Sequence, residues 1–137
     1  MNVEERKQEA LKWLKKAKGD LRVARLAFTD REGPEYGVAC YLAQQCAEKS
    51  LKAFLISTGI EFAYKHDLEY LIELFPDEDK AAFAGIELEW LSDWVTEGRY
   101  PGDWPEATHE DAKKAIAMAE AIYNNIVEAL ETGESCR

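Results

Sequence analysis

Apolar residues recur at steps of three and four along nearly the whole chain, which is the period of an amphipathic α-helix. The first run predicts one helix over residues 3–29, because its apolar positions continue without a break: Ala10, Leu14, Ala17, Leu21, Ala24 and Phe28. A turn at 30–34 follows, and Pro34 is well placed to begin the next helix. We expect that second helix to reach about Ser57, with Gly59 as its C-terminal cap.

The remaining pattern predicts three further helices. A short one spans roughly residues 66–75, and a fourth opens at Asp77 and runs through Trp94. A fifth begins at Thr108, where Asp111 completes a capping box, and continues to about Glu131. No segment has the alternating pattern that is typical of a β-strand.

These elements predict an all-α fold in one domain over residues 1–131, with residues 132–137 as a frayed tail. Short connections favour antiparallel neighbours, so we expect an up-and-down bundle of four long helices plus one short helix. One connection is long. It runs from Glu97 to Ala107, contains the sequence GRYPGDWP, and is about eleven residues in length. Long connections of this kind are disproportionately functional.

Composition narrows the class of protein. The chain has 137 residues, enough for one domain with a substantial core. No apolar stretch approaches the roughly 20 residues that span a bilayer, and the N-terminus is charged from residue four, unlike a secretory signal. The cysteines are odd in number, Cys40, Cys46 and Cys136, and favour reduced thiols. We therefore expect a cytoplasmic protein that does not associate with a membrane.

The net charge of −10 is unevenly distributed. Residues 1–28 hold eight Lys and Arg against four Asp and Glu, a local charge of +4, and the remainder carries −14. One interpretation is a basic helix that lies beside acidic neighbours. The other is a local basic face for RNA or another polyanion, because a phosphate chain responds to the local field.

A polar stripe accompanies the apolar face of the second predicted helix. Tyr41, Gln45, Glu48 and Lys52 recur at steps of four, three and four, so they share one side of the helix. An exposed salt bridge from Glu48 to Lys52 would account for two of them and contribute about 0.3–0.5 kcal/mol. It leaves Tyr41 and Gln45 unexplained, and a hydroxyl beside an amide suits recognition of a ligand.

Other polar residues are interpreted as structural. Asp20 lies beside the apolar seam of the first helix, and we expect it to find a cation or donor in another helix. His66 has no partner at metal-ligand spacing. Glu106 and His109 form a single Glu-x-x-His pair, whereas a di-iron bundle needs two. Cys46 is on the apolar face, where a thiol packs as a small hydrophobe. The sequence therefore predicts no metal and no cofactor.

The long connection contains Arg99-Tyr100-Pro101. Arg99 could cap the end of the fourth helix, with Tyr100 as a lid over the core. Alternatively, the guanidinium fork and the aromatic ring could hold a phosphate and a base.

Together these motifs resemble the HEPN domain (higher eukaryote and prokaryote nucleotide-binding) over about residues 4–131. The resemblance is carried by four segments of the chain: Trp13 to Ala24 in the basic first helix, AQQCAEKSLKA at 43–53, His66-Asp67-Leu68, and Arg99-Tyr100-Pro101. It implies a helical bundle that commonly forms a homodimer, with the second and fourth helices near a shared cleft. It also implies a small nucleotidyltransferase partner in a system similar to toxin–antitoxin modules.

Many members of that family are metal-independent RNases in which an Arg and a His are separated by four to six residues. Here nine residues separate Arg99 from His109, and Tyr100 replaces the usual small polar residue. The family's Arg-x4-His-x-Tyr motif, whose tyrosine accepts nucleotidyl groups, is not matched either. These departures favour binding over catalysis.

The leading hypothesis is a dimeric HEPN protein that binds a nucleotide or RNA beside a nucleotidyltransferase. Arg99 and Lys52 would contact phosphate, and Gln45 would recognise a polar edge. The other ligand-binding residues would be Tyr41, Glu48 and Tyr100. One alternative is a metal-independent RNase that uses Arg99 and His109. The other is a pure protein-interaction module anchored by Tyr100 and Trp104.

Overall fold

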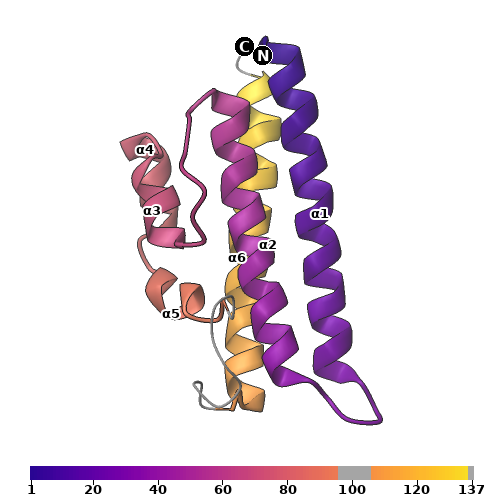
Figure 1. Ribbon diagram of the computed structural model, residues 1–137. Helices are drawn as coiled ribbons and strands as arrows, with labels where there is room; N and C mark the ends of the chain where they lie inside the picture. The colour runs from indigo at the N-terminus through magenta and orange to yellow at the C-terminus, as the bar shows by residue number, and fades with distance from the viewer. Residues whose placement is uncertain (96–105, 136–137) are drawn as a thin grey trace.

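The computed structural model describes residues 1–95 and 106–135, and these residues form helices and loops without a β-strand. The predicted all-α class is therefore confirmed. Three long helices dominate the described part of the chain: α1 (Val3–Thr29), α2 (Tyr36–Thr58) and α6 (His109–Ser135) (Figure 1). Shorter helical segments lie between α2 and α6 in the sequence: α3 (Leu68–Glu73), α4 (Asp77–Lys80), the 3₁₀ turn η1 (Ala81–Phe83) and α5 (Leu88–Ser92).

Helix α1 has the bounds that its apolar spacing predicts. A capping box fixes its start: the Asn2 side chain accepts a hydrogen bond from the Glu5 backbone N–H at 2.8 Å, and the Glu5 carboxylate accepts one from the Asn2 N–H at 3.1 Å. The buried positions are the predicted ones: Ala10, Leu14, Ala17, Leu21 and Ala24. Three of the five are alanines, so neighbouring helices can approach α1 closely.

Helix α2 ends at the predicted cap, Gly59. This residue has a φ of 77°, in the left-handed region, and its N–H donates to the carbonyl of Ile56 at 3.1 Å. A Cβ added here would lie 3.3 Å from Nε of Arg6 in α1. Backbone conformation and space therefore both favour glycine at this position.

The segment from Asp77 to Trp94 is not the single long helix that its spacing predicts. It is divided into α4, η1 and α5, with Gly85 in the break. Phe83 and Leu91 are its only buried side chains. A continuous helix is stabilised mainly by the packing of an apolar face, and this segment buries one side chain on either side of Gly85, a residue that disfavours the interior of a helix. The preceding short helix is confirmed as α3, with Asp67 as its N-cap.

Helix α6 begins as predicted. The Thr108 hydroxyl accepts from the Asp111 N–H at 3.1 Å, and the Asp111 carboxylate accepts from the Thr108 N–H at 3.0 Å. The predicted capping box is therefore confirmed. The helix continues past its expected end near Glu131 and reaches Ser135.

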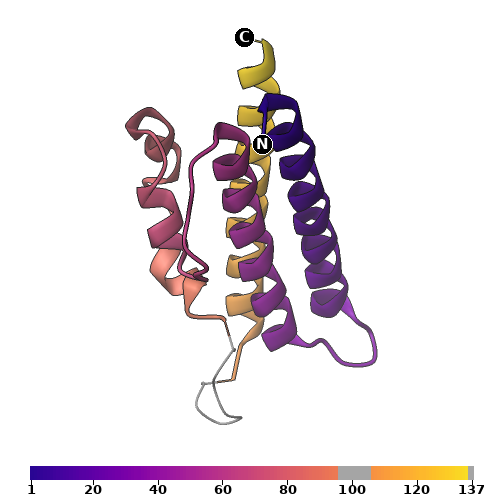
Figure 2. The ribbon, with the colours of Figure 1, turned by 45° about the horizontal axis from the view of Figure 1, so that its top comes forward.

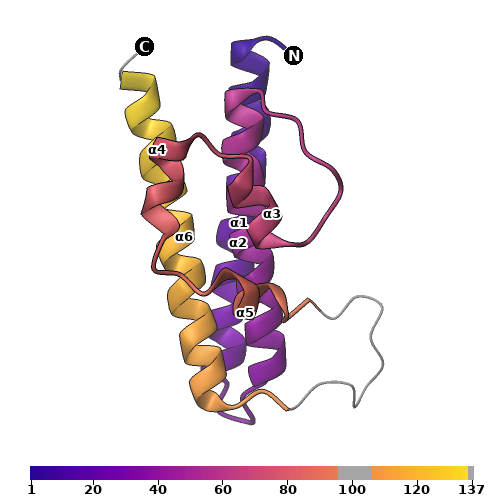
Figure 3. The same ribbon diagram turned by 90° about the vertical axis from the view of Figure 1, so that its left-hand side faces the viewer.

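The long helices α1, α2 and α6 pack together, and the α3–α5 segment forms a second layer on one side of them (Figures 1 and 3). Helix α1 is antiparallel to α2, but α2 and α6 run in the same direction, because residues 59–95 carry the chain back along the bundle (Figure 2). Ring contacts confirm this direction. The ring centre of His109, at the start of α6, lies 4.8 Å from that of Phe28 near the end of α1 and 5.6 Å from that of Tyr36 at the start of α2. None of the described helices is long and apolar enough to cross a membrane.

The substitution Gly59→Ala is expected to lower the free energy of unfolding by about 1–2 kcal/mol, because alanine disfavours a positive φ. Gly19→Ala is the matched control. Gly19 is exposed within α1, and no atom lies within 4 Å of a Cβ added there, so Gly19→Ala should raise the free energy of unfolding by about 0.5–1 kcal/mol. Urea denaturation measures both values, and effects of the same sign would contradict this account of the cap.

Candidate functional site

The polar stripe of α2 is divided into a buried half and an accessible half. Glu48 and Lys52 are only 4% and 3% exposed, whereas Tyr41 and Gln45 are partly exposed. Helical spacing correctly indicates that the four residues share a side of α2, but they lie at different depths. The buried pair meets the segment 59–67, which connects α2 to α3.

Glu48 is the centre of a buried polar network. Its Oε1 accepts a hydrogen bond from the Gln44 amide at 3.2 Å and lies 2.9 Å from Nδ1 of His66, while its Oε2 accepts from the Lys52 ammonium at 2.9 Å. Gln44 also donates to the backbone carbonyl of His66 at 3.0 Å. Both oxygens of the desolvated carboxylate therefore have partners, which is the condition under which a buried ion pair is tolerated. His66 has the structural contact that its interpretation implies, and it ties α2 to the following segment.

Lys52 is enclosed by aromatic rings, and its expected contact with a phosphate is therefore not supported. Its Nζ lies 5.9 Å from the ring centre of Trp13, 5.8 Å from that of Phe62 and 5.3 Å from that of Tyr64, within the range of cation–π attraction. The three rings and the Glu48 carboxylate replace the water that would otherwise solvate the Lys52 ammonium. The salt bridge to Glu48 forms as expected, but in the core rather than on the surface, so neither partner presents its charge to a ligand.

Gln44, which is outside the predicted stripe, fixes the orientation of Gln45. The Gln44 NH₂ group faces two acceptors, Glu48 and the carbonyl of His66, so its oxygen must face the other way. That oxygen accepts a hydrogen bond from the Gln45 NH₂ group at 2.7 Å. Its position four residues before Glu48 is the signal in the sequence that could have identified Gln44.

Tyr64 is a second residue that sequence reasoning missed. It is 84% exposed, yet its ring lies against Lys52 and 5.4 Å edge-on from the ring of His66. An exposed aromatic ring supported from below by a buried network is a surface on which a base can stack. Periodicity could not indicate this residue, because Tyr64 lies in a connection rather than in a helix.

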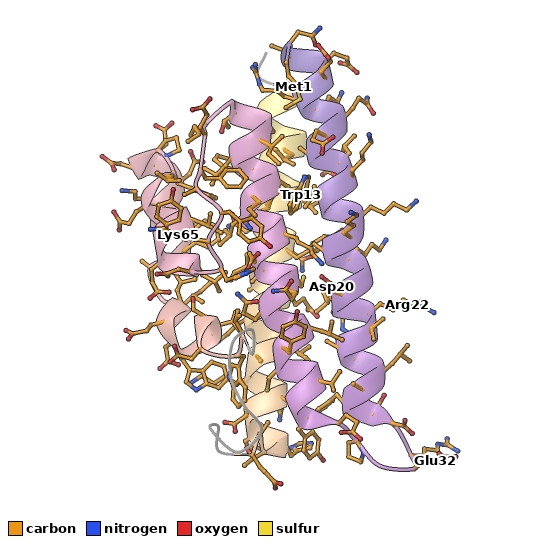
Figure 4. All side chains as sticks on the ribbon, viewed as in Figure 1. Met1, Trp13, Asp20, Arg22, Glu32 and Lys65 are labelled. Atoms are coloured by element: carbon orange, nitrogen blue, oxygen red, sulfur yellow. The ribbon has the colours of Figure 1, made fainter. Side chains whose placement is uncertain are left out.

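Asp20 has the partner that was predicted for it. Its carboxylate accepts a hydrogen bond from the Lys49 ammonium of α2 at 2.6 Å, and both side chains are about one-fifth exposed. Figure 4 shows Asp20 and Trp13 on the side of α1 that faces α2. This ion pair therefore joins the two helices beside the Glu48 network.

The two described thiols are poorly suited to nucleophilic catalysis. Burial raises the pKa of Cys40 to about 12, and it also raises the pKa of Cys46 to about 12. Both therefore remain protonated at neutral pH, in agreement with their place in the core. No cluster of potential metal ligands occurs among the residues that the structure describes.

Three of the predicted functional residues, Arg99, Tyr100 and Trp104, lie outside the described residues. His109 is described: its imidazole is half exposed and its Nδ1 lies 3.2 Å from Glu110. It contacts Tyr36, which is nine residues before Gln45 and so about 13 Å away along the axis of α2. The structure thus places His109 near the first turn of α2 rather than beside Gln45, and the RNase alternative, which also requires Arg99, stays a prediction.

Lys52→Met is expected to lower the free energy of unfolding by about 3–5 kcal/mol, because Glu48 would remain buried without its cation. Lys49→Met is the matched control. It removes a partly exposed pair on the same helix, for which we expect a loss of about 1 kcal/mol. Chemical denaturation gives both values. The double substitution Glu48→Gln with Lys52→Met should recover part of the larger loss, and equal losses for the two single substitutions would contradict a buried network.

Comparison with known proteins gives consistent matches over most of the chain. The HEPN domain family matches residues 10–130. The chain is similar to the crystal structure of ST0689, an archaeal HEPN homologue, with 31% identity, a TM-score of 0.65, and coverage of 88% of this chain and 97% of that chain. It is also similar to the crystal structure of TT1696 from Thermus thermophilus, with 25% identity, a TM-score of 0.65, and coverage of 87% and 96%. No curated protein matches the chain.

Proposed function

The chain belongs to the HEPN family, and on this premise we propose that it binds a nucleotide or a segment of RNA beside Tyr41, Gln45 and Tyr64. We further propose that it acts as a cytoplasmic homodimer with a small nucleotidyltransferase, in a system similar to a toxin–antitoxin module. Support for that partner comes from the family alone. The binding proposal has support from the geometry of α2.

The supporting observation is that Gln45 is partly exposed and is held by a hydrogen bond to a buried residue. Its amide nitrogen donates one hydrogen to Gln44, which is held by Glu48 and His66 in turn. A glutamine has two donors and an acceptor oxygen, so one N–H and the oxygen are left without a partner among the described residues, at a partly exposed site. A donor and an acceptor that are held in place by a buried network lose little conformational freedom on binding. They suit the polar edge of a base, which also presents donors and acceptors.

Two tyrosines, one on either side of Gln45 along α2, suit the faces of bases. Tyr41 lies one turn before Gln45 on the same side of α2. Tyr64 lies over Lys52, which is two turns beyond Gln45. Stacking of a base on an aromatic side chain contributes about 1–3 kcal/mol. For the phosphate we propose Arg99 and Tyr100, on the family resemblance, since Lys52 is buried.

For the proposed homodimer, we suggest a contact surface on the same side of the bundle as Gln45. Val38 lies in the first turn of α2, about two turns before Gln45 on the same side of the helix, and it is 46% exposed. An exposed aliphatic residue next to Tyr41 is consistent with burial of this side of α2 near a second subunit. In such a dimer the two Gln45 side chains would approach one shared cleft.

Titration of the ¹⁵N-labelled protein with ATP and with a short single-stranded RNA tests the binding proposal. We expect the side-chain amide signal of Gln45 and the backbone signals of residues 41 and 64 to shift. Gln45→Ala should weaken binding about tenfold, equivalent to about 1.4 kcal/mol. Gln8→Ala is the matched control, because Gln8 is an exposed glutamine of α1 that donates to Glu4 at 3.0 Å. Unchanged binding in Gln45→Ala, or shifts confined to other helices, would refute the assignment.

A further inference from the structure

A cationic cleft lies between α1 and α6, on the side of α1 away from Gln45. Lys18, Arg22 and Arg25 of α1 follow one another at steps of four and three, so they share one side of the helix. The cleft has a volume of about 410 Å³, and its α6 wall contains Glu120, Tyr123 and Asn124. The basic character of the N-terminal region is thus concentrated at a concave site.

The charges of this cleft are only partly neutralised. Arg25 forms an ion pair with Glu120 across the cleft. Among the described residues, no ion pair involves Lys18 or Arg22, and both side chains are exposed. Figure 4 shows Arg22 extending away from the bundle. Three cations and one anion leave a net charge of about +2 at this cleft, in a chain whose net charge is −10. The cleft therefore has too few acidic residues to neutralise the basic residues of α1 that line it.

The α6 wall adds groups that a purely electrostatic patch lacks. Tyr123 is partly buried, and desolvation raises the pKa of its hydroxyl, with a smaller contribution from Cys46. The hydroxyl therefore remains a hydrogen-bond donor at neutral pH. Asn124 is exposed and has both a donor and an acceptor. Exposed cations beside an aromatic ring and an amide are the combination with which proteins bind phosphate and base together.

We propose that this cleft binds single-stranded RNA, with Lys18 and Arg22 in contact with successive phosphates and with Tyr123 and Asn124 against one base. Single strands fit the cleft because their bases are free to reach the ring and the amide. Charge complementarity supports the assignment: the cleft is positive, while most of the remaining charge of the chain repels a polyanion. This site is separate from the Gln45 site, so either proposal can fail without the other.

The test measures fluorescence anisotropy of a labelled oligouridylate of about 12 nucleotides, a length within the usual range for single-strand sites. In about 0.15 M salt, long-range effects of surface charge are largely screened. The double substitution Lys18→Glu with Arg22→Glu should weaken binding at least tenfold. It should also reduce the slope of log affinity against log salt by about 1.4, since each phosphate contact on a single strand contributes about 0.7.

Lys12→Glu with Lys16→Glu is the matched control. It places the same change of charge at the same i,i+4 spacing on α1, but on the side away from α6. We expect this variant to retain binding within threefold of the parent. Thermal melting checks that each variant is folded. If the variant with Lys18→Glu and Arg22→Glu is unfolded, Lys18→Gln with Arg22→Gln is measured in its place.

Three results would overturn the proposal. One is a parent protein that does not bind the oligonucleotide at this salt concentration. Another is an equal loss of binding in the two charge-reversal variants, which would show a diffuse field rather than a site. The third is displacement of the RNA by an equal concentration of polyglutamate, which would indicate that the cleft accepts an acidic protein segment instead.

Discussion

The arrangement of this protein depends on one buried carboxylate. Glu48 has lost almost all contact with water, and an unpaired carboxylate in such a position would be strongly destabilising. Its partners come from two parts of the chain: Lys52 and Gln44 from its own helix, and His66 from the segment that follows. Because the network is complete only when residue 66 is in place, it favours one position for the connection between α2 and α3.

The same constraint places the aromatic residues of that connection. The buried ammonium of Lys52 is surrounded by the rings of Phe62 and Tyr64 from the connection and of Trp13 from α1. The network therefore joins α1, α2 and the segment leading to α3, while the Asp20–Lys49 pair adds a second polar link between the two helices. Gln45 is the accessible end of this arrangement. The buried polar residues of α2 are thus adjacent to the residues proposed to bind a ligand, and the buried network holds Gln45 in position.

The sequence predicts most of this fold because the long helices are specified locally. The spacing of alanines and leucines gives the bounds of α1, and Gly59 and Thr108 mark the end of α2 and the start of α6. The segment at 77–94 was predicted less well, since a helical pattern of apolar residues does not reveal how many of them find a core to pack against. The site was predicted in part. Spacing places Tyr41, Gln45, Glu48 and Lys52 on one side, but their depth depends on residues 59–67, which have no helical period.

Native-state hydrogen exchange of the Glu48→Ala variant tests the central role of the carboxylate most directly. Helix α3 follows His66 closely and is short, so its amides, such as that of Leu71 bonded to the Asp67 carbonyl, report local opening of this region. If the carboxylate holds this region in place, protection in α3 falls at least tenfold more than protection at buried positions of α1 and α6. An equal loss of protection in all three helices, or unchanged protection in α3, would contradict that role.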